Sequence, residues 1–183
     1  MGKIVLQDVR CSYVFVTEES KNGGYGVQPL IPKGSKLEKR INAEVLKVLA
    51  EKHGEKALKT KGKFKLPLRD GDDERDTPEY EGMMFFNANC GKKNGKKPGL
   101  VNRQGDPADE ADIEDYCYSG AYFHVSINVY GYDSVDGGKP GVAMGLNNLM
   151  LRKKGKRLDG SIAATDEFAD FADDEDDDDD FDL

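Results

Sequence analysis

The clearest pattern of apolar and polar positions in the chain lies between residues 121 and 132. Every second residue there is apolar, namely Phe123, Val125, Ile127 and Val129. A period of two predicts a half-buried strand, with this set in the core and the intervening set facing outward. The intervening set consists of Tyr122, His124, Ser126, Asn128, Tyr130 and Tyr132. The outward face of this strand is therefore unusually rich in tyrosine.

Shorter apolar runs predict further strands over residues 3–17, 63–68, 83–88 and 142–151. The first is rich in β-branched and aromatic residues and is expected to bend or bulge near its middle. Pro67 places the second at a sheet edge, because proline cannot donate a ladder hydrogen bond. Gly145 marks a candidate bulge in the last strand.

One amphipathic helix is predicted over about 35–53. Ser35 and Glu38 form a capping box, in which the hydroxyl accepts from the backbone NH at position 38 and the carboxylate reaches back. Apolar residues then follow at helical spacing, and Gly54 is the expected stop. The acidic stretches 70–81 and 106–115 contain glycine and proline and are predicted to be solvated loops.

These elements, with no alternation of strand and helix, predict a mainly β fold. An OB-fold-like five-stranded barrel with the one added helix fits the size best. We expect residues 1–165 to form this domain. Residues 166–183 are expected to form a disordered acidic tail.

Charge separates these two parts more sharply than hydropathy does. The chain has 183 residues and a net charge of −8, but the last 18 positions hold 12 acidic residues and no basic one. The rest of the chain is slightly basic, and a run such as 173–180 repels itself. Aromatic or aliphatic side chains lie between the acidic residues of the tail and are candidate anchors for a protein partner. They are Phe168, Phe171, Phe181 and Leu183.

Catalysis and metal binding find little support in the sequence. Cys11, Cys90 and Cys117 are widely spaced and form no zinc or disulfide pattern, and the two histidines suggest no catalytic set. We therefore expect no cofactor, no metal and no enzymatic activity. No apolar run approaches the ~20 residues needed to span a bilayer, and no signal peptide is evident. A location in the cytoplasm and no membrane association are expected.

Aromatic and basic residues together point to nucleic acid, because rings stack on bases and cations neutralise phosphates. The candidate stacking residues are Tyr116, Tyr118, Tyr122, Tyr130 and Tyr132. The candidate phosphate contacts are Lys92, Lys93, Lys96, Lys97, Arg103, Lys153, Lys154, Lys156 and Arg157. An alternative reading is purely structural: the tyrosines cover core edges, and the lysine-rich segment 91–99 is a solvated loop.

Several segments in order resemble a known family. They are Pro98 to Asn102, Tyr118-Ser119-Gly120, Ser126 to Tyr130, and Lys139 to Asn148. This order is similar to bacteriophage single-stranded-DNA-binding proteins related to the replication proteins of short-tailed coliphages. The resemblance implies an OB-fold, no catalysis, and an acidic tail that docks replication proteins and occupies the DNA groove when DNA is absent. The coliphage proteins end on an aromatic residue, whereas here Asp182 and Leu183 follow Phe181.

The leading hypothesis is sequence-independent binding of single-stranded DNA in phage replication, recombination or repair. The tail would dock a phage or host polymerase, helicase or nuclease, in the cytoplasm of an infected bacterium. A monomer or weak dimer is expected. The alternative is an acidic-tailed chaperone or anti-host interaction module without DNA binding. A metal-dependent nuclease using clustered carboxylates is a third and weaker reading.

Overall fold

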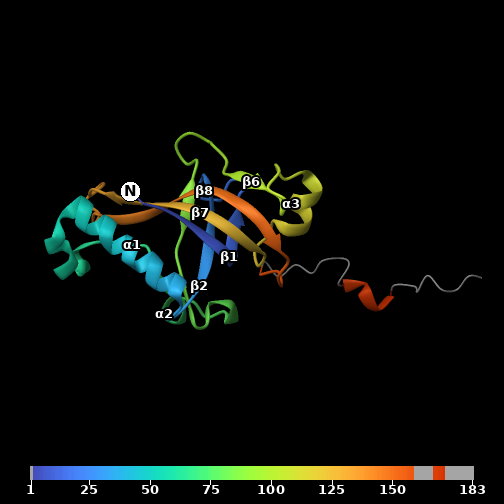
Figure 1. Cartoon of the computed structure of the whole chain (residues 1–183), viewed down its shortest axis with the longest axis horizontal. Helices are drawn as coiled ribbons and strands as arrows, with labels where there is room; N and C mark the ends of the chain where they lie inside the picture. Colours follow the sequence, from blue (N-terminus) through green and yellow to red (C-terminus); the bar gives the residue numbers. More distant parts are fainter. Residues whose placement is uncertain (1, 159–166, 172–183) are drawn as a thin grey trace, which may run out of the picture.

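Five strands close into a ring in the computed structural model, which describes residues 2–158 and 167–171 (Figure 1). They are β1 (Gly2–Phe15), β2 (Tyr25–Pro32), β5 (Ala88–Cys90), β7 (Tyr122–Tyr132) and β8 (Gly141–Lys153). Each pairs with the next around the ring β1–β2–β5–β8–β7, and β7 pairs back to β1. All these pairs are antiparallel except β5 with β8. The closed ring confirms the predicted OB-like barrel.

The core of the barrel is built by the strand that the sequence defines best. Phe123, Val125, Ile127 and Val129 are all fully buried, as the alternation predicted. β7 lies between β1 and β8, so these side chains meet the inward residues of both neighbours. Leu6 of β1 and Leu151 of β8 are likewise fully buried. The central strand and its parity are therefore confirmed.

Bulges shape the long strands. β1 shifts register between Leu6 and Val9 and again between Ser12 and Phe15, which confirms the expected bend. The predicted bulge at Gly145 is wrong, because this residue pairs regularly with Asn128. The unpaired residues of β8 lie instead at Asn147 and Arg152, opposite the two register shifts of β7.

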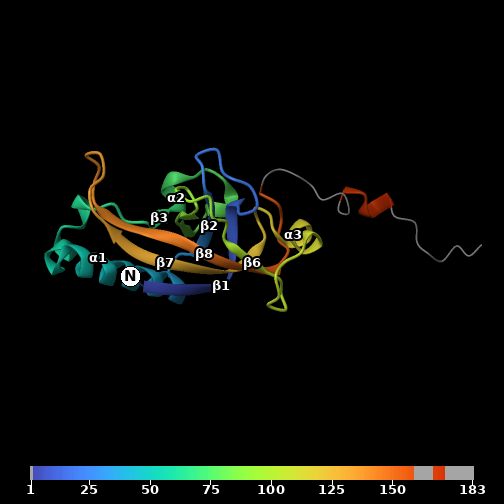
Figure 2. The same ribbon diagram turned by 90° about the horizontal axis from the view of Figure 1, so that it is seen from above.

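The helix α1 (Lys36–His53) packs across β1 and β7 (Figures 1 and 2). The Ser35 hydroxyl accepts from the NH of Glu38 at 3.1 Å, as predicted. The Glu38 carboxylate reaches the NH of Gly34 rather than that of Ser35. The helix ends at Gly54, whose positive φ of 87° and NH bond to the Ala50 carbonyl confirm the predicted stop.

Two strand predictions differ from the structure. β2 was missed because all its residues except Pro32 are buried, so no alternation marks it. The predicted edge strand over 63–68 is wrong. Lys65 makes only an isolated bridge with Gly141, and pairing begins in β3 (Arg69–Asp70), beyond Pro67. The predicted strand 83–88 is divided between β4 (Met83–Phe85) and β5. A further short strand, β6 (Gly99–Val101), pairs in parallel with β8.

The two acidic stretches are folded rather than simple solvated loops. The first contains α2 (Gly71–Glu74) and a 3-10 turn, Pro78–Tyr80, which buries the Tyr80 ring. The second forms α3 (Glu110–Tyr116), because Asp109 and Asp112 make a reciprocal capping box. Acidic residues at a helix start favour the helix through its dipole. Two further 3-10 turns, Glu55–Lys59 and Lys61–Lys63, follow α1.

The acidic tail lies mostly outside the described residues. Within 167–171, Ala169–Phe171 form a 3-10 turn, and the rings of Phe168 and Phe171 are exposed. The predicted anchors Phe181 and Leu183 lie outside the described part of the chain. No helix within the described ranges is long and apolar enough to cross a membrane.

Candidate nucleic-acid interface

The outer surface of the ring carries a continuous row of outward-facing residues across five strands. Cross-strand pairing links neighbours in the order Phe15, Gly26, Asn89, Gly145 and Asn128. Their neighbours along the strands point into the core, so by alternation these residues face outward. These five residues form a floor on one side of the barrel, and we refer to them as the floor below.

This floor lies low because two of its members are glycines, which carry no side chain. A Cβ on Gly26 would lie 2.2 Å from the Asn89 Oδ1 and 2.8 Å from the Ala88 carbonyl oxygen. A Cβ on Gly145 would lie 3.6 Å from the edge of the Tyr130 ring. Glycine in a strand often marks a place where a ligand or another backbone approaches closely.

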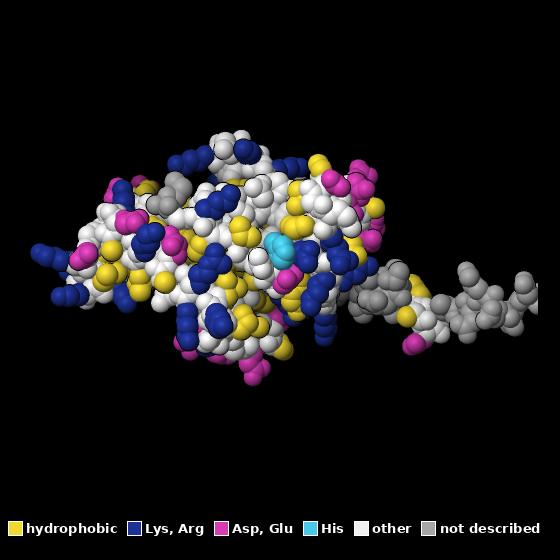
Figure 3. Space-filling model, viewed as in Figure 1, with side chains coloured by type: hydrophobic (Ala, Val, Ile, Leu, Met, Phe, Trp, Pro, Cys, Tyr) yellow, Lys and Arg dark blue, Asp and Glu magenta, His cyan; other side chains and the backbone are white. Residues whose placement is uncertain are grey.

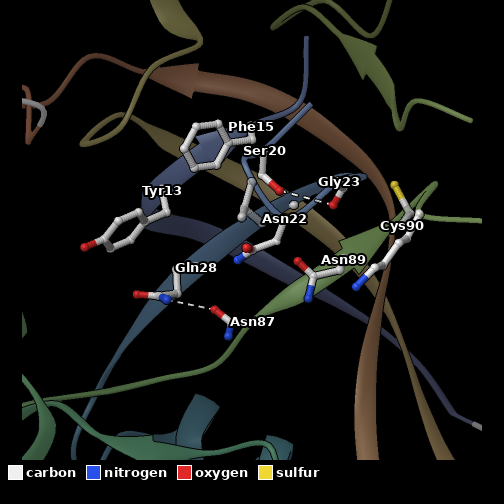
Figure 4. Close-up of a pocket in the computed structure, with 12 residues that line it drawn as sticks. Tyr13, Phe15, Ser20, Asn22, Gly23, Gln28, Asn87, Asn89 and Cys90 are labelled. Atoms are coloured by element: carbon white, nitrogen blue, oxygen red, sulfur yellow. Dashed lines mark hydrogen bonds between the residues drawn. The ribbon is translucent and has the colours of Figure 1, made fainter. Parts of the chain in front are cut away.

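Two neighbouring hollows lie along this floor, and both are lined by Asn87 and Asn89. We call the pair the central groove, and Figure 4 shows the first of the two hollows. Its first hollow is flanked by the β1–β2 loop, residues 16–24, and its second by the β7–β8 loop, residues 133–140. In OB-folds these two loops, with the second and third strands of the barrel, form the face that binds oligonucleotides.

Aromatic rings stand at both ends of the central groove. Tyr13 and Phe15 line the first hollow and are 52% and 39% exposed. Tyr130 and Tyr132 line the second hollow, and Tyr130 is 40% exposed. Burial raises the pKa of Tyr132, so its phenol stays neutral at physiological pH. The Tyr132 ring therefore brings no negative charge toward a phosphate.

The backbone at Tyr13 is held in an uncommon conformation. Its φ is +46°, in the left-handed region that residues other than glycine rarely adopt. This angle falls within the second bulge of β1, beside Phe15. Strained backbone of this kind occurs preferentially at functional sites. The bulge thus places two exposed rings at the edge of the groove.

Positive charge borders the groove on both sides. Lys92 lines the first hollow, and Lys65 and Arg69 line the second. Arg69 also makes a two-pronged contact with Glu74, with N to O distances of 3.0–3.1 Å. A further hollow, lined by Lys96 and Lys97, adjoins the first hollow through Cys90. Burial raises the pKa of the Cys90 thiol, so it stays neutral beside these lysines.

A second basic surface lies where residues 153–158 fold back on residues 118–122; we call it the C-terminal clasp. The Tyr118 hydroxyl donates to the Gly155 carbonyl at 2.8 Å and accepts from the Gly155 NH at 3.0 Å. The Arg10 guanidinium donates to the carbonyls of Gly120 and Lys156. A Cβ on Gly120 would lie 2.1 Å from the Lys156 carbonyl oxygen, so the two segments are in close backbone contact.

Three cations of the clasp lie over tyrosine rings. Lys153 is 4.4 Å from the Tyr122 ring centre, Lys154 is 5.4 Å from that of Tyr116, and Arg157 is 4.1 Å from that of Tyr118. Such contacts leave the positive charge unneutralised. Within residues 2–158 and 167–171, no carboxylate forms an ion pair with a cation of residues 153–157. Figure 3 shows basic side chains gathered at the right-hand end of the barrel, below α3.

A fourth hollow connects the clasp with the groove. Tyr13 and Phe15 form one wall of it, and Tyr118 and Leu158 lie on its other side. The two exposed rings of β1 therefore border both the central groove and this hollow. The groove and the clasp form one connected surface.

The structure divides the residues predicted from the sequence between these surfaces. Tyr130, Tyr132 and Lys92 lie in the central groove, and Lys96 and Lys97 lie beside it. The clasp holds Tyr116, Tyr118, Tyr122, Lys153, Lys154, Lys156 and Arg157. Lys93 and Arg103 are exposed but line none of these hollows.

The tyrosines of β7 are not one stacking platform. Tyr122 and Tyr130 share the outward face of the strand, but eight residues separate them, or about 26 Å of strand. Tyr122 is half-buried under Lys153 in the clasp, whereas Tyr130 faces the groove. The single face expected from parity is therefore two sites on one strand.

A family model described as the ssDNA-binding protein of Enterobacter phage Enc34 matches residues 2–181 of this sequence. The chain belongs to this family. A relative with 28% identity, the putative protein p50 of Acyrthosiphon pisum secondary endosymbiont phage 1, matches over 93% of this chain and 94% of its own length. The family model covers both the barrel and most of the acidic tail.

Solved structures of phage proteins share the fold. The single-stranded DNA-binding protein from bacteriophage Enc34 superposes with a TM-score of 0.69 at 21% identity, covering 91% of this chain and 90% of that one. The same protein in complex with ssDNA gives 0.67 at 22% identity, over 86% and 89% of the two chains. The gp2.5 protein of bacteriophage T7 gives 0.62 at 16% identity, over 95% and 97%. The fold of this chain is therefore the fold of these solved phage proteins.

Several groove residues escaped prediction from the sequence, among them Tyr13, Phe15, Asn87 and Asn89. The rings of Tyr13 and Phe15 belong to a strand whose bulges break the period of two. The alternation of residues therefore could not show which face of the strand these rings occupy. Asn87 and Asn89 flank buried Ala88, an alternation too short to detect. Among the described residues, no three His, Cys, Asp or Glu side chains gather into a cluster able to hold a metal ion.

Proposed function

We propose that this chain binds single-stranded DNA in the central groove, with little dependence on sequence. The observation that carries the proposal is the floor of small and amide residues between two pairs of aromatic rings, on the ligand-binding face of an OB-like barrel. Membership in a family named for single-stranded DNA binding supports it, as does a relative solved with ssDNA. We further propose a role in phage DNA replication, recombination or repair.

The groove would act by stacking and charge. Tyr13 and Phe15 at one end, and Tyr130 and Tyr132 at the other, offer ring faces to bases of any identity. Each stacked base contributes about 1–3 kcal/mol. Lys65 and Lys92 at the rim would meet phosphates. No covalent step is involved, so binding affinity is the measure of function.

We propose that the strand continues from the groove, past the rings of β1, onto the C-terminal clasp. The hollow that joins the two surfaces supports this path. The clasp cations rest on tyrosine rings and keep their charge available for phosphates. The predicted phosphate contacts of residues 153–157 would then extend the site beyond the groove.

The proposed binding of single-stranded DNA is tested by titrating labelled oligo-dT, matched duplex and matched RNA into the full chain at two salt concentrations. Anisotropy reports binding, and tyrosine fluorescence reports stacking without interference because the chain has no tryptophan. If about five phosphates are neutralised, log K falls with log salt with a slope of roughly −3.5. Binding of oligo-dT with tyrosine quenching is the expected result.

Absence of oligo-dT binding by the full chain, and also by a chain lacking the tail, would refute the proposal. Equal binding of duplex and oligo-dT, without a change in tyrosine fluorescence, would contradict stacking and leave only a charge effect. A protein partner of the tail would then become the main question.

We also propose that the acidic tail competes with DNA for the groove and, once released, docks replication proteins. Deleting residues 166–183 removes 12 acidic side chains and is expected to tighten oligo-dT binding. The effect should shrink as salt rises, because screening weakens the competition. A chain of unchanged length with Asp173 to Asp180 replaced by serine and asparagine separates charge from chain length. Unchanged affinity in both variants would rule out competition by the tail.

A further inference from the structure

Two surface segments of opposite charge lie at opposite ends of the molecule. Residues 54–65 follow α1 and hold five lysines and one acidic residue; we call them the basic segment. Residues 104–117 include α3 and hold six acidic residues and no basic one; we call them the acidic segment. Figures 1 and 2 place the end of α1 and α3 at opposite ends in both views. Figure 3 shows basic side chains projecting at the left-hand end and acidic side chains gathered over α3.

The basic segment is held against the barrel while its lysines face solvent. Ala57 is buried beneath the first 3-10 turn, and the Phe64 ring packs on His53 with ring centres 4.9 Å apart. The Lys139 ammonium, from the β7–β8 loop, donates to the Gly62 carbonyl at 2.9 Å. No exposed lysine of the segment forms an ion pair with a residue that the structure describes. These lysines are Lys56, Lys59, Lys61, Lys63 and Lys65.

The acidic segment likewise has charge that the chain itself does not neutralise. Asp109 and Asp112 use their carboxylates in the capping box of α3. Glu110, Glu114 and Asp115 are exposed, and none of them pairs with a cation in the described part of the chain. Glu110 and Glu114 are four residues apart on the helix, so they repel each other. A cation from another molecule would relieve that repulsion.

The proposed path of the DNA strand runs from one segment to the other. Lys65, the last lysine of the basic segment, lines the second hollow of the central groove. Tyr116, at the end of α3, lies beneath Lys154 of the C-terminal clasp, with 5.4 Å between the ammonium and the ring centre. The clasp is itself basic, but a bound strand would neutralise it with its phosphates. The carboxylates of α3 would then be the unpaired charge at that exit.

We propose that copies bound to one strand contact each other head to tail, with the basic segment of one copy against α3 of the next. The groove has different rings at its two ends and a DNA strand has a direction, so all copies bind in one orientation. Each junction then joins unlike surfaces and repeats without closing. Complementary charge favours this arrangement over like ends meeting. This inference rests on the proposed DNA binding and path, and adds cooperativity along the strand to them.

The test measures cooperativity with the full chain at low and high salt. The quantity is the ratio of affinity per copy on a long oligo-dT, which takes several copies, to affinity on a short oligo-dT, which takes one. An exposed ion pair is worth up to about fivefold in affinity, so about two or three pairs at a junction predict a ratio of roughly ten at low salt. The ratio should approach one as salt rises, because screening weakens exposed pairs.

Charge reversal on the two segments gives the sharper result. Glu114→Lys with Asp115→Lys should lower the ratio to about one or below; both residues lie in the last turn of α3, where positive charge suits the helix dipole. Lys61→Glu with Lys63→Glu should lower the ratio in the same way. A chain carrying all four substitutions should recover most of the ratio, because the charges that meet at each junction are again opposite.

The matched control reverses two cations at the start of α1, away from both segments. Lys36→Glu with Arg40→Glu changes the net charge by the same amount as the lysine reversal and should leave the ratio unchanged. Glu114→Gln with Asp115→Asn removes charge without reversing it. This variant should lower the ratio by a smaller factor, and it covers the case in which the reversal on α3 does not fold.

Three results would overturn the inference, and they are distinguishable. If the unmodified chain binds neither oligonucleotide, the proposed function fails and this inference fails with it. If it binds both with equal affinity per copy at low salt, DNA binding stands and the copies do not contact each other. If the reversal on α3 leaves the ratio unchanged, or the fourfold variant recovers none of it, the copies do not meet through these two segments.

Discussion

Replacing Tyr13 and Tyr130 together by alanine is expected to weaken oligo-dT binding by roughly 30-fold or more. Each ring stands at one end of the central groove, and loss of one stacked base costs about 1–3 kcal/mol. Both rings are about half exposed, at 52% and 40%, so the fold depends little on them. Fluorescence anisotropy with labelled oligo-dT measures the effect.

The matched control is Leu58→Ala, since Leu58 is 37% exposed and lies outside the groove. It should change neither affinity nor thermal midpoint. The double variant should also melt like the unmodified chain, which separates lost stacking from lost structure. A loss of less than threefold in the double variant would show that bases do not stack on these rings.

Phe123→Ala is expected to lower the free energy of unfolding by about 3–5 kcal/mol, measured by urea titration. Its side chain is fully buried on the inward face of β7, where β1 and β8 cover it from both sides. Truncation leaves a cavity that the closed ring of strands cannot collapse to fill.

Its neighbour provides the control. Tyr122 is half-buried, points outward, and contacts Lys153 rather than the core. Tyr122→Ala should therefore cost less than about 1 kcal/mol, the range of a partly exposed cation and ring contact. An equal loss of unfolding free energy in the two variants would mean that the alternation along β7 does not determine which side chains belong to the core.

The sequence allowed β7 to be predicted because one of its faces is buried and the other is not. β2 lacks that contrast, because residues on both of its faces are buried. It also contains two prolines. The helix over 36–53 was predictable from the Ser35 cap and its apolar spacing. The helix α3 was not predicted because its acidic cap, Asp109 with Asp112, looks like part of a solvated loop.

The site was predictable only in part, for a related reason. Tyr130 and Tyr132 keep the parity of a regular strand, so their outward direction follows from the pattern. Tyr13 and Phe15 follow bulges that shift the register, and no pattern in the sequence locates those shifts. Gln28 bonds to Asn87 and to Tyr80, which are distant from it in sequence and meet it only in the folded chain.

The closed ring of strands has a further consequence for the proposed function, because several copies of the chain can bind side by side on one long DNA strand. An open sheet edge offers unpaired NH and carbonyl groups, which recruit strands from neighbouring molecules. Each of the five barrel strands here is flanked on both sides, and β5 with β8 completes the circuit. Copies crowded together on DNA would therefore have few free backbone groups through which to fuse into aggregates.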